Sequence, residues 1–311
     1  MFKMLFSGFL LMQLSIAYGK VEMRWLTVTS VLIEDGQSRI LFDPMFTRAG
    51  LLNWLNLKKM TADEELIKQE LKHLEIDKID AVFASHSHFD HVIDAPIVAK
   101  LTGAIFYVDK SSERIARAYQ DPKIKTDRIT ALRPIYVGDF KITPVVRTHS
   151  PIKLGFHYLS GEVPVDFDFG FYDYHVGETW FYYITHPHGK ILLDQGSLPF
   201  LDKARGLTEK VDVLIQGVAN RKNDETVIEG YPKILQPKIF IPTHFDNFFF
   251  GFDRSGNSDL PGIQLGRLLN KMRGAYPEMK VLKPEYGKKI FLFEAKKREP
   301  KLPLKKKIRK R

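Results

Sequence analysis

The 311 residues are 44% hydrophobic and 12% aromatic, which excludes a disordered, collagen-like or coiled-coil chain and is typical of a globular protein with a sizeable core. Because the sequence contains no cysteine, disulfides, a cysteine nucleophile and thiolate metal ligands are excluded, and any metal would need His, Asp or Glu ligands. The formal net charge is +10, which by itself suggests nucleic acid as a partner.

Most of this charge lies at the C-terminus. Residues 296–311 (KKREPKLPLKKKIRKR) hold ten Lys or Arg and one Glu, a net +9, which leaves the rest of the chain at +1. Proteins that bind nucleic acid usually carry their charge on a folded face, so nucleic acid is a poor candidate partner. We expect 296–311 to be a disordered tail. It is either a solvated terminus or an electrostatic attachment to an anionic membrane surface or polymer.

The first 19 residues have the pattern of a secretory signal peptide. Lys3 precedes an apolar run over residues 4–17, and small residues follow at Ala17 and Gly19. The run is shorter than the roughly 18 to 20 residues needed to span a bilayer. A buried N-terminal helix is the alternative. We expect cleavage after Gly19, a secreted or periplasmic protein, and one domain over residues 20–295.

From residue 25 onward, short apolar segments alternate with helical patterns. An apolar run over 25–33, a turn at Asp35-Gly36 and a second run over 39–42 indicate a hairpin. Residues 63–74 place their leucines and isoleucine on one helical face, and a buried strand is expected over 80–84. Further helices are expected over 96–101, 113–119 and 225–235, and further strands over 104–108, 140–146, 180–184, 190–194, 211–215 and 238–241. The pattern predicts two mixed β/α halves.

The segment with the strongest chemical signal is 85–92, which reads SHSHFDHV directly after the expected strand 80–84. Alternate residues of an extended loop point the same way, so His86 and His88 can bind one metal ion. The turn that follows lets Asp90 and His91 face a second ion. Imidazole and carboxylate are ligands that borderline divalent cations prefer. The alternative is a polar loop in which three histidines cluster without a chemical reason.

The pattern H-x-H-x-D-H resembles that of the metallo-β-lactamase-fold hydrolases, and the match runs from about Trp25 to about Phe293. Four further residues occur in the order that this resemblance implies, each after an apolar strand: Asp43, His149, Asp194 and His244. The resemblance implies an α/β fold in which two mixed β-sheets, flanked by helices, form an αββα sandwich.

The resemblance also implies two divalent metal ions, with zinc expected first and manganese or iron as alternatives. The implied ligands are His86, His88 and His149 for one ion and Asp90, His91 and His244 for the other, with Asp194 bridging both. Asp43 would orient the metal-binding loop without binding metal. A metal-bound hydroxide would attack the substrate, and Asp90 would also act as a catalytic residue by handling the leaving group's proton.

Departures from the family pattern narrow the resemblance. Leu193 stands where a glycine usually precedes the bridging aspartate, and His88 stands where flavo-diiron oxygen reductases have a glutamate. The common zinc-type β-lactamases need a cysteine ligand that this chain lacks. The order and spacing are most similar to the branch containing the ascorbate-6-phosphate lactonase and the phosphatidylethanolamine-type phospholipases D.

We therefore expect a hydrolase that cleaves an ester, lactone or phosphodiester bond of a small-molecule or lipid-like substrate. Residues 156–183 and 245–252 are rich in aromatic side chains, which either line an apolar substrate rim or pack in the core. Phe167, Phe169 and Phe171 alternate with polar residues or glycine as in a half-buried strand. His157 and His175 are left as candidate substrate contacts. Two other functions stay open: a non-catalytic metal- or membrane-surface-binding protein on the same fold, and a secreted nuclease, which the near-neutral body disfavours.

Overall fold

The computed structural model describes residues 20–149, 153–154, 157–196, 210–219, 221–249, 251–252, 254 and 259–293. Only the backbone is described for 153–154 and 157–158. The expected signal peptide (1–19) and basic tail (296–311) lie outside these residues, so both stay predictions. In the described part of the chain, no helix combines the length and apolar character needed to cross a membrane.

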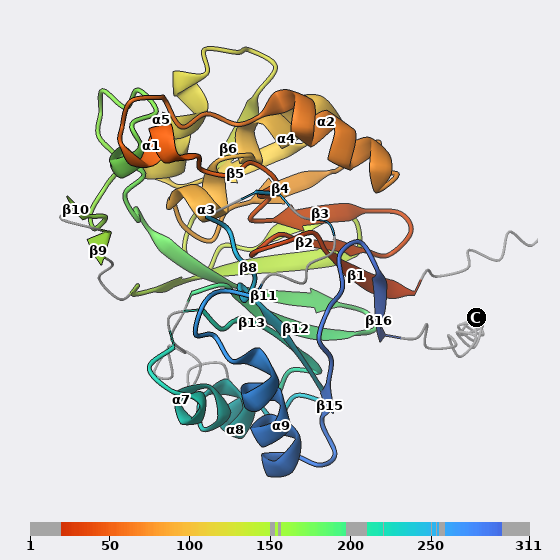
Figure 1. Cartoon of the computed structure of the whole chain (residues 1–311). Helices are drawn as coiled ribbons and strands as arrows, with labels where there is room; N and C mark the ends of the chain where they lie inside the picture. Colours follow the sequence, from red (N-terminus) through yellow and green to blue (C-terminus); the bar gives the residue numbers. More distant parts are fainter. Residues whose placement is uncertain are drawn as a thin grey trace, which may run out of the picture.

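Two mixed sheets, each of seven strands within the described residues, pack face to face (Figure 1). The first has the order β16-β1-β2-β3-β4-β5-β6 and the second the order β15-β14-β13-β12-β11-β8-β7. Helices α1, α2, α4 and α5 lie on the outer side of the first sheet, and α7, α8 and α9 on that of the second (Figure 1). The expected αββα sandwich is confirmed.

The strands of the first sheet are β1 (Val21–Trp25), β2 (Val31–Glu34), β3 (Arg39–Phe42), β4 (Ala81–Phe83), β5 (Ile105–Val108), β6 (Lys125–Arg128) and β16 (Lys289–Phe293). Its helices are α1 (Leu51–Trp54), α2 (Glu64–His73), α3 (Phe89–Val92), α4 (Ala95–Thr102) and α5 (Lys110–Ala118). The strands of the second sheet are β7 (Ile135–Val137), β8 (Phe140–Arg147), β11 (Thr179–His186), β12 (Gly189–Asp194), β13 (Val213–Gly217), β14 (Ile239–Thr243) and β15 (Lys280–Val281). Its helices are α7 (Asp224–Ile228), α8 (Tyr231–Leu235) and α9 (Leu265–Ala275). Three short elements lie between β8 and β11 in the sequence: the paired strands β9 (Lys153–Leu154) and β10 (His157–Tyr158), and the 3₁₀ helix η1 (Phe171–Asp173).

Aromatic side chains join the two sheets where the metal-binding loop begins. Phe42 and Phe83 of the first sheet stack with ring centroids 5.1 Å apart, and Phe83 packs 5.3 Å from Tyr182 of β11. The buried Tyr182 hydroxyl donates to the carbonyl of Ala84 at 2.7 Å. The core thus holds the end of β4 in place, directly before the histidine-rich segment.

Three expectations about local structure are wrong. Residues 25–33 are not one strand, because a buried turn with Thr27 and Val28 at φ of 84° and 48° separates β1 from β2. The expected helix 225–235 is split into α7 and α8 at Gly230, which precedes Pro232. The segment around Phe169 is not a strand.

Candidate metal centre

The candidate metal-binding residues all follow the ends of strands at one edge of the sandwich. They come after β3 (Asp43), β4 (His86, His88, Asp90 and His91), β8 (His149) and β14 (His244), and Asp194 ends β12. Pairing within each sheet and packing between the sheets bring these ends together, although the residues are up to about two hundred positions apart in the sequence.

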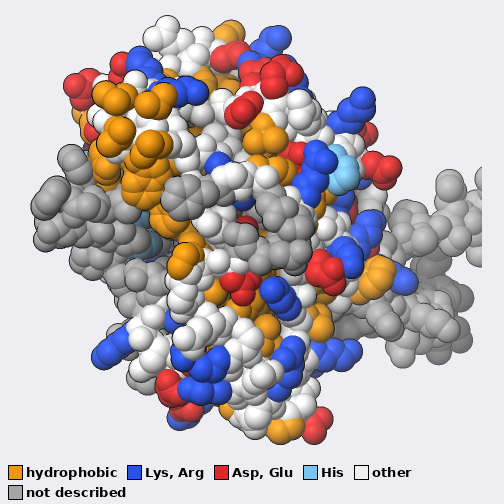
Figure 2. Space-filling model, viewed as in Figure 1, with side chains coloured by type: hydrophobic (Ala, Val, Ile, Leu, Met, Phe, Trp, Pro, Cys, Tyr) orange, Lys and Arg blue, Asp and Glu red, His pale blue; other side chains and the backbone are white. Residues whose placement is uncertain are grey.

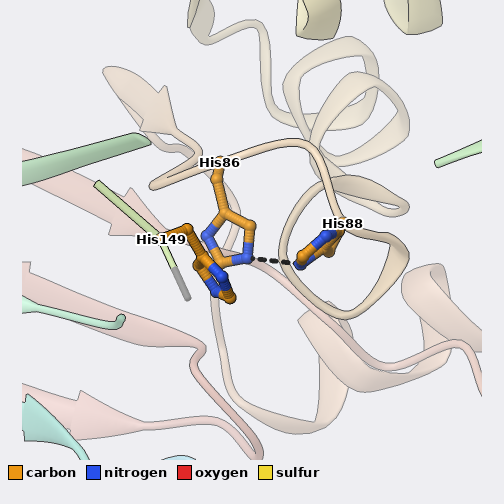
Figure 3. A group of neighbouring side chains, drawn as sticks. All are labelled: His86, His88 and His149. Carbon is orange, nitrogen blue, oxygen red and sulfur yellow. Dashed lines mark hydrogen bonds between the residues drawn. The ribbon is translucent and has the colours of Figure 1, made fainter. Parts of the chain in front are cut away.

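The first group contains His86, His88 and His149, whose candidate ligand atoms lie within 4.8 Å of one another. The Nε2 of His86 is 3.0 Å from the Nδ1 of His88. The His149 ring lies 4.7 Å from that of His86 and 5.0 Å from that of His88, centroid to centroid. Figure 3 shows the three rings turned toward one another, with His149 reaching the loop after β4 from the end of β8.

The second group contains Asp90, His91 and His244, again with ligand atoms within 4.8 Å. The Oδ2 of Asp90 lies 3.2 Å from the Nε2 of His244 and 3.6 Å from the Nε2 of His91. The groups adjoin, because the rings of His91 and His86 have centroids only 3.8 Å apart.

The surroundings of His86 and His88 favour metal binding. Burial lowers the pKa of His86 far below its ordinary value and that of His88 to about 4, so both imidazoles are neutral at pH 7 with lone pairs able to bind a cation. Burial also disfavours the charged form of His91, but Asp90 and Asp43 outweigh it and raise the pKa of His91. Five imidazoles and one carboxylate are a donor set suited to one borderline dication in each group. That they bind metal stays a prediction.

Asp43 supports the histidine loop. Its buried carboxylate accepts hydrogen bonds from the Ser85 backbone N–H at 2.5 Å and the Ser85 hydroxyl at 2.8 Å, and its Oδ2 lies 2.9 Å from the Nδ1 of His91. An anionic partner on Nδ1 leaves the Nε2 of His91 to face the second group. Asp43 itself has φ of 46°, an uncommon conformation of the kind found where a functional site requires it.

The turn between β1 and β2 is part of the site, which sequence reasoning missed. The Val28 carbonyl accepts from the N–H of His244 at 2.8 Å, and the Thr29 hydroxyl donates to the Asp90 carbonyl at 3.1 Å. Gln195 donates to the Thr29 carbonyl at 2.8 Å and accepts from the Thr243 hydroxyl at 2.6 Å. The sequence signal for this turn is a group of three polar residues, Thr27, Thr29 and Ser30, inside an apolar run.

Asp194 lies outside both groups. One of its carboxylate oxygens pairs with the guanidinium of Arg147 and the other accepts from the Tyr231 hydroxyl at 2.6 Å. A Cβ at Gly196 would lie 1.5 Å from a guanidinium nitrogen of Arg147, so a larger residue there would require the guanidinium to move. The bridging role that the resemblance implies for Asp194 stays a prediction, and this structure gives its carboxylate other partners.

The other histidines lie elsewhere. His186 ends β11, and His188 lies in the turn between β11 and β12. His186 forms a third group with Asp35 and Asp139. This group lies at the opposite end of β11 from the candidate metal centre, and β11 is roughly 23 Å long at 3.3 Å per residue, so the group is separate from that centre. His175 is half-buried, and its Nδ1 lies 2.9 Å from the Glu162 carbonyl. The side chain of His157 is outside the described residues.

Comparisons with known proteins agree with this arrangement. A family model described as the metallo-beta-lactamase superfamily matches residues 23–201. The chain belongs to the metallo-β-lactamase superfamily. The resemblance expected from the sequence is thereby confirmed, while the finer placement beside the lactonase and phospholipase D branch stays a prediction.

Relatives within the superfamily match most of the chain. It is 26% identical over 243 residues to a UPF0173 metal-dependent hydrolase of Anaeromyxobacter sp. (strain K), covering 75% of this chain and 77% of that protein. It is 23% identical over 227 residues to a UPF0173 protein of Pyrococcus furiosus, covering 72% and 83%.

Solved structures share the fold. A metallo hydrolase from Ignicoccus hospitalis aligns with a TM-score of 0.57 at 18% identity, over 89% of this chain and all of that one. An isothiocyanate hydrolase from Delia radicum gut bacteria aligns with a TM-score of 0.54 at 13% identity, over 86% and 98%. At these identities the likeness extends to the fold alone.

Proposed function

We propose that this protein is a metal-dependent hydrolase that cleaves an ester, lactone or phosphodiester bond of a small or lipid-like substrate. Membership of the superfamily and relatives that are named metal-dependent hydrolases support the hydrolase activity. The observation that carries the proposal is the pair of adjoining groups of His and Asp side chains at one edge of the sandwich.

Bound divalent ions, zinc in the first instance, would lower the pKa of a coordinated water and polarise a substrate oxygen. The protein's own contribution is positional. His86 and His88 offer neutral rings, and Asp43 fixes His91. Burial opposes the ionised form of Asp90, but His91 and His244 outweigh it and lower its pKa, so Asp90 is ionised at neutral pH. We keep for its carboxylate the proposed role of handling the leaving group's proton.

Aromatic side chains beside the second group, two of which are half-buried (Trp54 and Phe249), support a substrate with an apolar portion. The ring of Phe248 lies 5.2 Å from that of His244 and 4.2 Å from that of Phe249, and Phe249 packs 5.1 Å from Trp54 of α1. The aromatic substrate rim expected from the sequence is smaller in the structure, because most of the candidate residues are buried in the core: Phe167, Phe169, Phe171, Tyr174, Phe245 and Phe248.

A substrate panel tests the proposal. It contains short- and long-chain aryl esters, a lactone and a phosphodiester, each with added zinc or manganese and with a chelator control. We expect chelator-sensitive turnover of at least one member, lost in His88→Ala and His244→Ala. His73→Ala is the matched control, because His73 is an exposed residue at the end of α2.

Turnover that is unaffected by the chelator, or equal in the His88→Ala and parent proteins, would contradict the mechanism. Tight metal binding with no turnover across the panel would favour a non-catalytic metal-binding protein. We also propose that the protein is exported and that residues 1–19 are its signal peptide. Determining the N-terminal sequence of the secreted or periplasmic protein tests this.

A further inference from the structure

Four leucines are exposed on α1 and the turn that follows it. Their exposed fractions are 73% for Leu51, 52% for Leu52, 57% for Leu55 and 72% for Leu57. Single exposed leucines are ordinary, but four within seven residues form an apolar patch, and such patches mark contact surfaces. We call these residues the leucine patch. Figure 2 shows hydrophobic side chains gathered over α1.

The inward side of this segment is polar and aromatic, which turns the leucines outward. Asn53 is buried, and its side chain accepts from the Gly50 N–H at 2.9 Å and donates to the carbonyls of Lys58 and Lys59 at 3.1 and 2.9 Å. The ring of Trp54 packs 4.9 Å from that of Phe171. A short helix that buries asparagine and exposes leucine has the reverse of the usual amphipathic pattern, so the exposure is held by specific contacts.

Two lysines adjoin the patch. Lys58 and Lys59 follow Leu57 directly and both are exposed. Lys59 forms an ion pair with Asp168 at 2.5 Å, while Lys58 contributes only its backbone carbonyl to the contacts described above. Apolar side chains that enter the acyl region, next to cations that meet lipid phosphates, are the features of proteins that lie at an anionic membrane surface.

A chain of aromatic contacts links the helix that carries the leucine patch to the candidate metal centre. Trp54, Phe249 and Phe248 connect α1 to His244 through ring contacts of 5.1, 4.2 and 5.2 Å. We propose that the leucine patch docks this protein on an anionic lipid bilayer and so brings its candidate metal centre to lipid-like substrates. The substrate part rests on the proposed function, whereas the docking part does not.

Vesicle sedimentation tests the docking. The purified protein is mixed with vesicles of phosphatidylcholine alone and of phosphatidylcholine with phosphatidylglycerol. We expect binding to the anionic vesicles, and a decrease of about tenfold or more in Leu51→Ser/Leu55→Ser, because two leucines no longer leave water. Leu132→Ser/Val165→Ser is the matched control, with two residues 68% and 84% exposed outside the patch, and should bind as the parent does.

Equal binding by the patch variant and the parent would overturn the proposal. It would also be overturned if deletion of 296–311 abolished binding while the patch variant kept it, since the tail would then be the anchor. A concentration-dependent dimer that the patch variant loses, without vesicle binding, would identify a second copy as the occupant instead. Vesicle binding by chelator-treated protein is expected to be unchanged, which separates failure of docking from failure of the proposed hydrolase.

Discussion

The guanidinium of Arg147 pairs with the carboxylate of Asp194 in the protein interior, where both side chains are almost completely buried. Arg147 ends β8, two residues before His149, and Asp194 ends β12. The Tyr231 hydroxyl takes the other carboxylate oxygen. The residue expected to bridge two ions is therefore neutralised by a cation of the same chain, next to the candidate metal centre.

Removing Arg147 would leave the Asp194 carboxylate buried without its cation. We predict that Arg147→Ala lowers the unfolding free energy of the metal-free protein by about 3 to 5 kcal/mol. Arg147→Ala/Asp194→Ala should recover part of this loss, because no unpaired charge stays buried. Urea unfolding of the parent, both single variants and the double variant measures the coupling. Additive losses would show that the pair contributes nothing beyond its separate side chains.

Tyr231→Phe is a milder change at the same carboxylate, because it keeps the ring and removes one hydrogen bond. We predict a loss of about 1 kcal/mol in unfolding free energy, which the same urea experiment measures. A loss as large as that of Arg147→Ala would mean that the hydroxyl, and not the guanidinium, is the principal partner of Asp194.

Asp43 is expected to tune metal affinity without binding metal. In Asp43→Asn the side-chain amide would face groups that donate to the carboxylate, the N–H and hydroxyl of Ser85. We predict metal affinity about 10 to 100 times weaker, measured by competition with a chromogenic chelator. Asp77→Asn, at an exposed carboxylate, should leave the affinity unchanged. Parent-like affinity in Asp43→Asn would contradict the assigned role.

Stability should depend on pH through Asp94. Burial raises the pKa of Asp94 to about 6, although the hydrogen bonds from Thr47 and Phe46 act to lower it. Between the ordinary value of 3.8 and pH 6 the unfolded chain releases this proton while the folded protein keeps it. The contribution of Asp94 to stability therefore falls as the pH rises through this window and stays at its lowest value above it.

The variant Asp94→Asn has no proton to lose at this position. We predict that, between pH 4 and pH 7, its unfolding free energy rises relative to that of the parent by about 2 kcal/mol. Urea unfolding of both proteins across this pH range checks the prediction. A chelator keeps both proteins free of metal, so the titration of the candidate metal ligands contributes equally to both and cancels in the comparison. A difference that does not change with pH would mean that Asp94 does not titrate in this window.

Helix α2 and the two groups of candidate ligands show what the sequence makes predictable. Asp63 caps α2 by accepting from the N–H of Leu66 at 3.0 Å, and its apolar residues repeat at helical spacing, so the signal is local. The candidate ligands were predictable because each follows an apolar strand. That these strands end at the same edge of the sandwich follows from the fold that the family resemblance implied.

Other features depend on partners that are distant in the sequence. Val28 belongs to an apolar run, yet it sits in a turn because the carboxylate of Asp246, 218 residues away, accepts its N–H. Arg147 meets Asp194 only because β11 lies between β8 and β12 in the sheet. Phe169 follows an alternating pattern but lies in an irregular segment that covers a separate part of the core.

The central claim is that the two groups each hold a divalent ion. It is tested most directly by measuring metal ions per chain, after reconstitution with zinc and removal of free metal, in the parent and in His88→Ala/His244→Ala, each shown to be folded. A difference between the two proteins isolates the candidate metal centre from any metal bound elsewhere. We predict that the double variant retains about two fewer ions per chain than the parent. Equal metal content in the two proteins would contradict it.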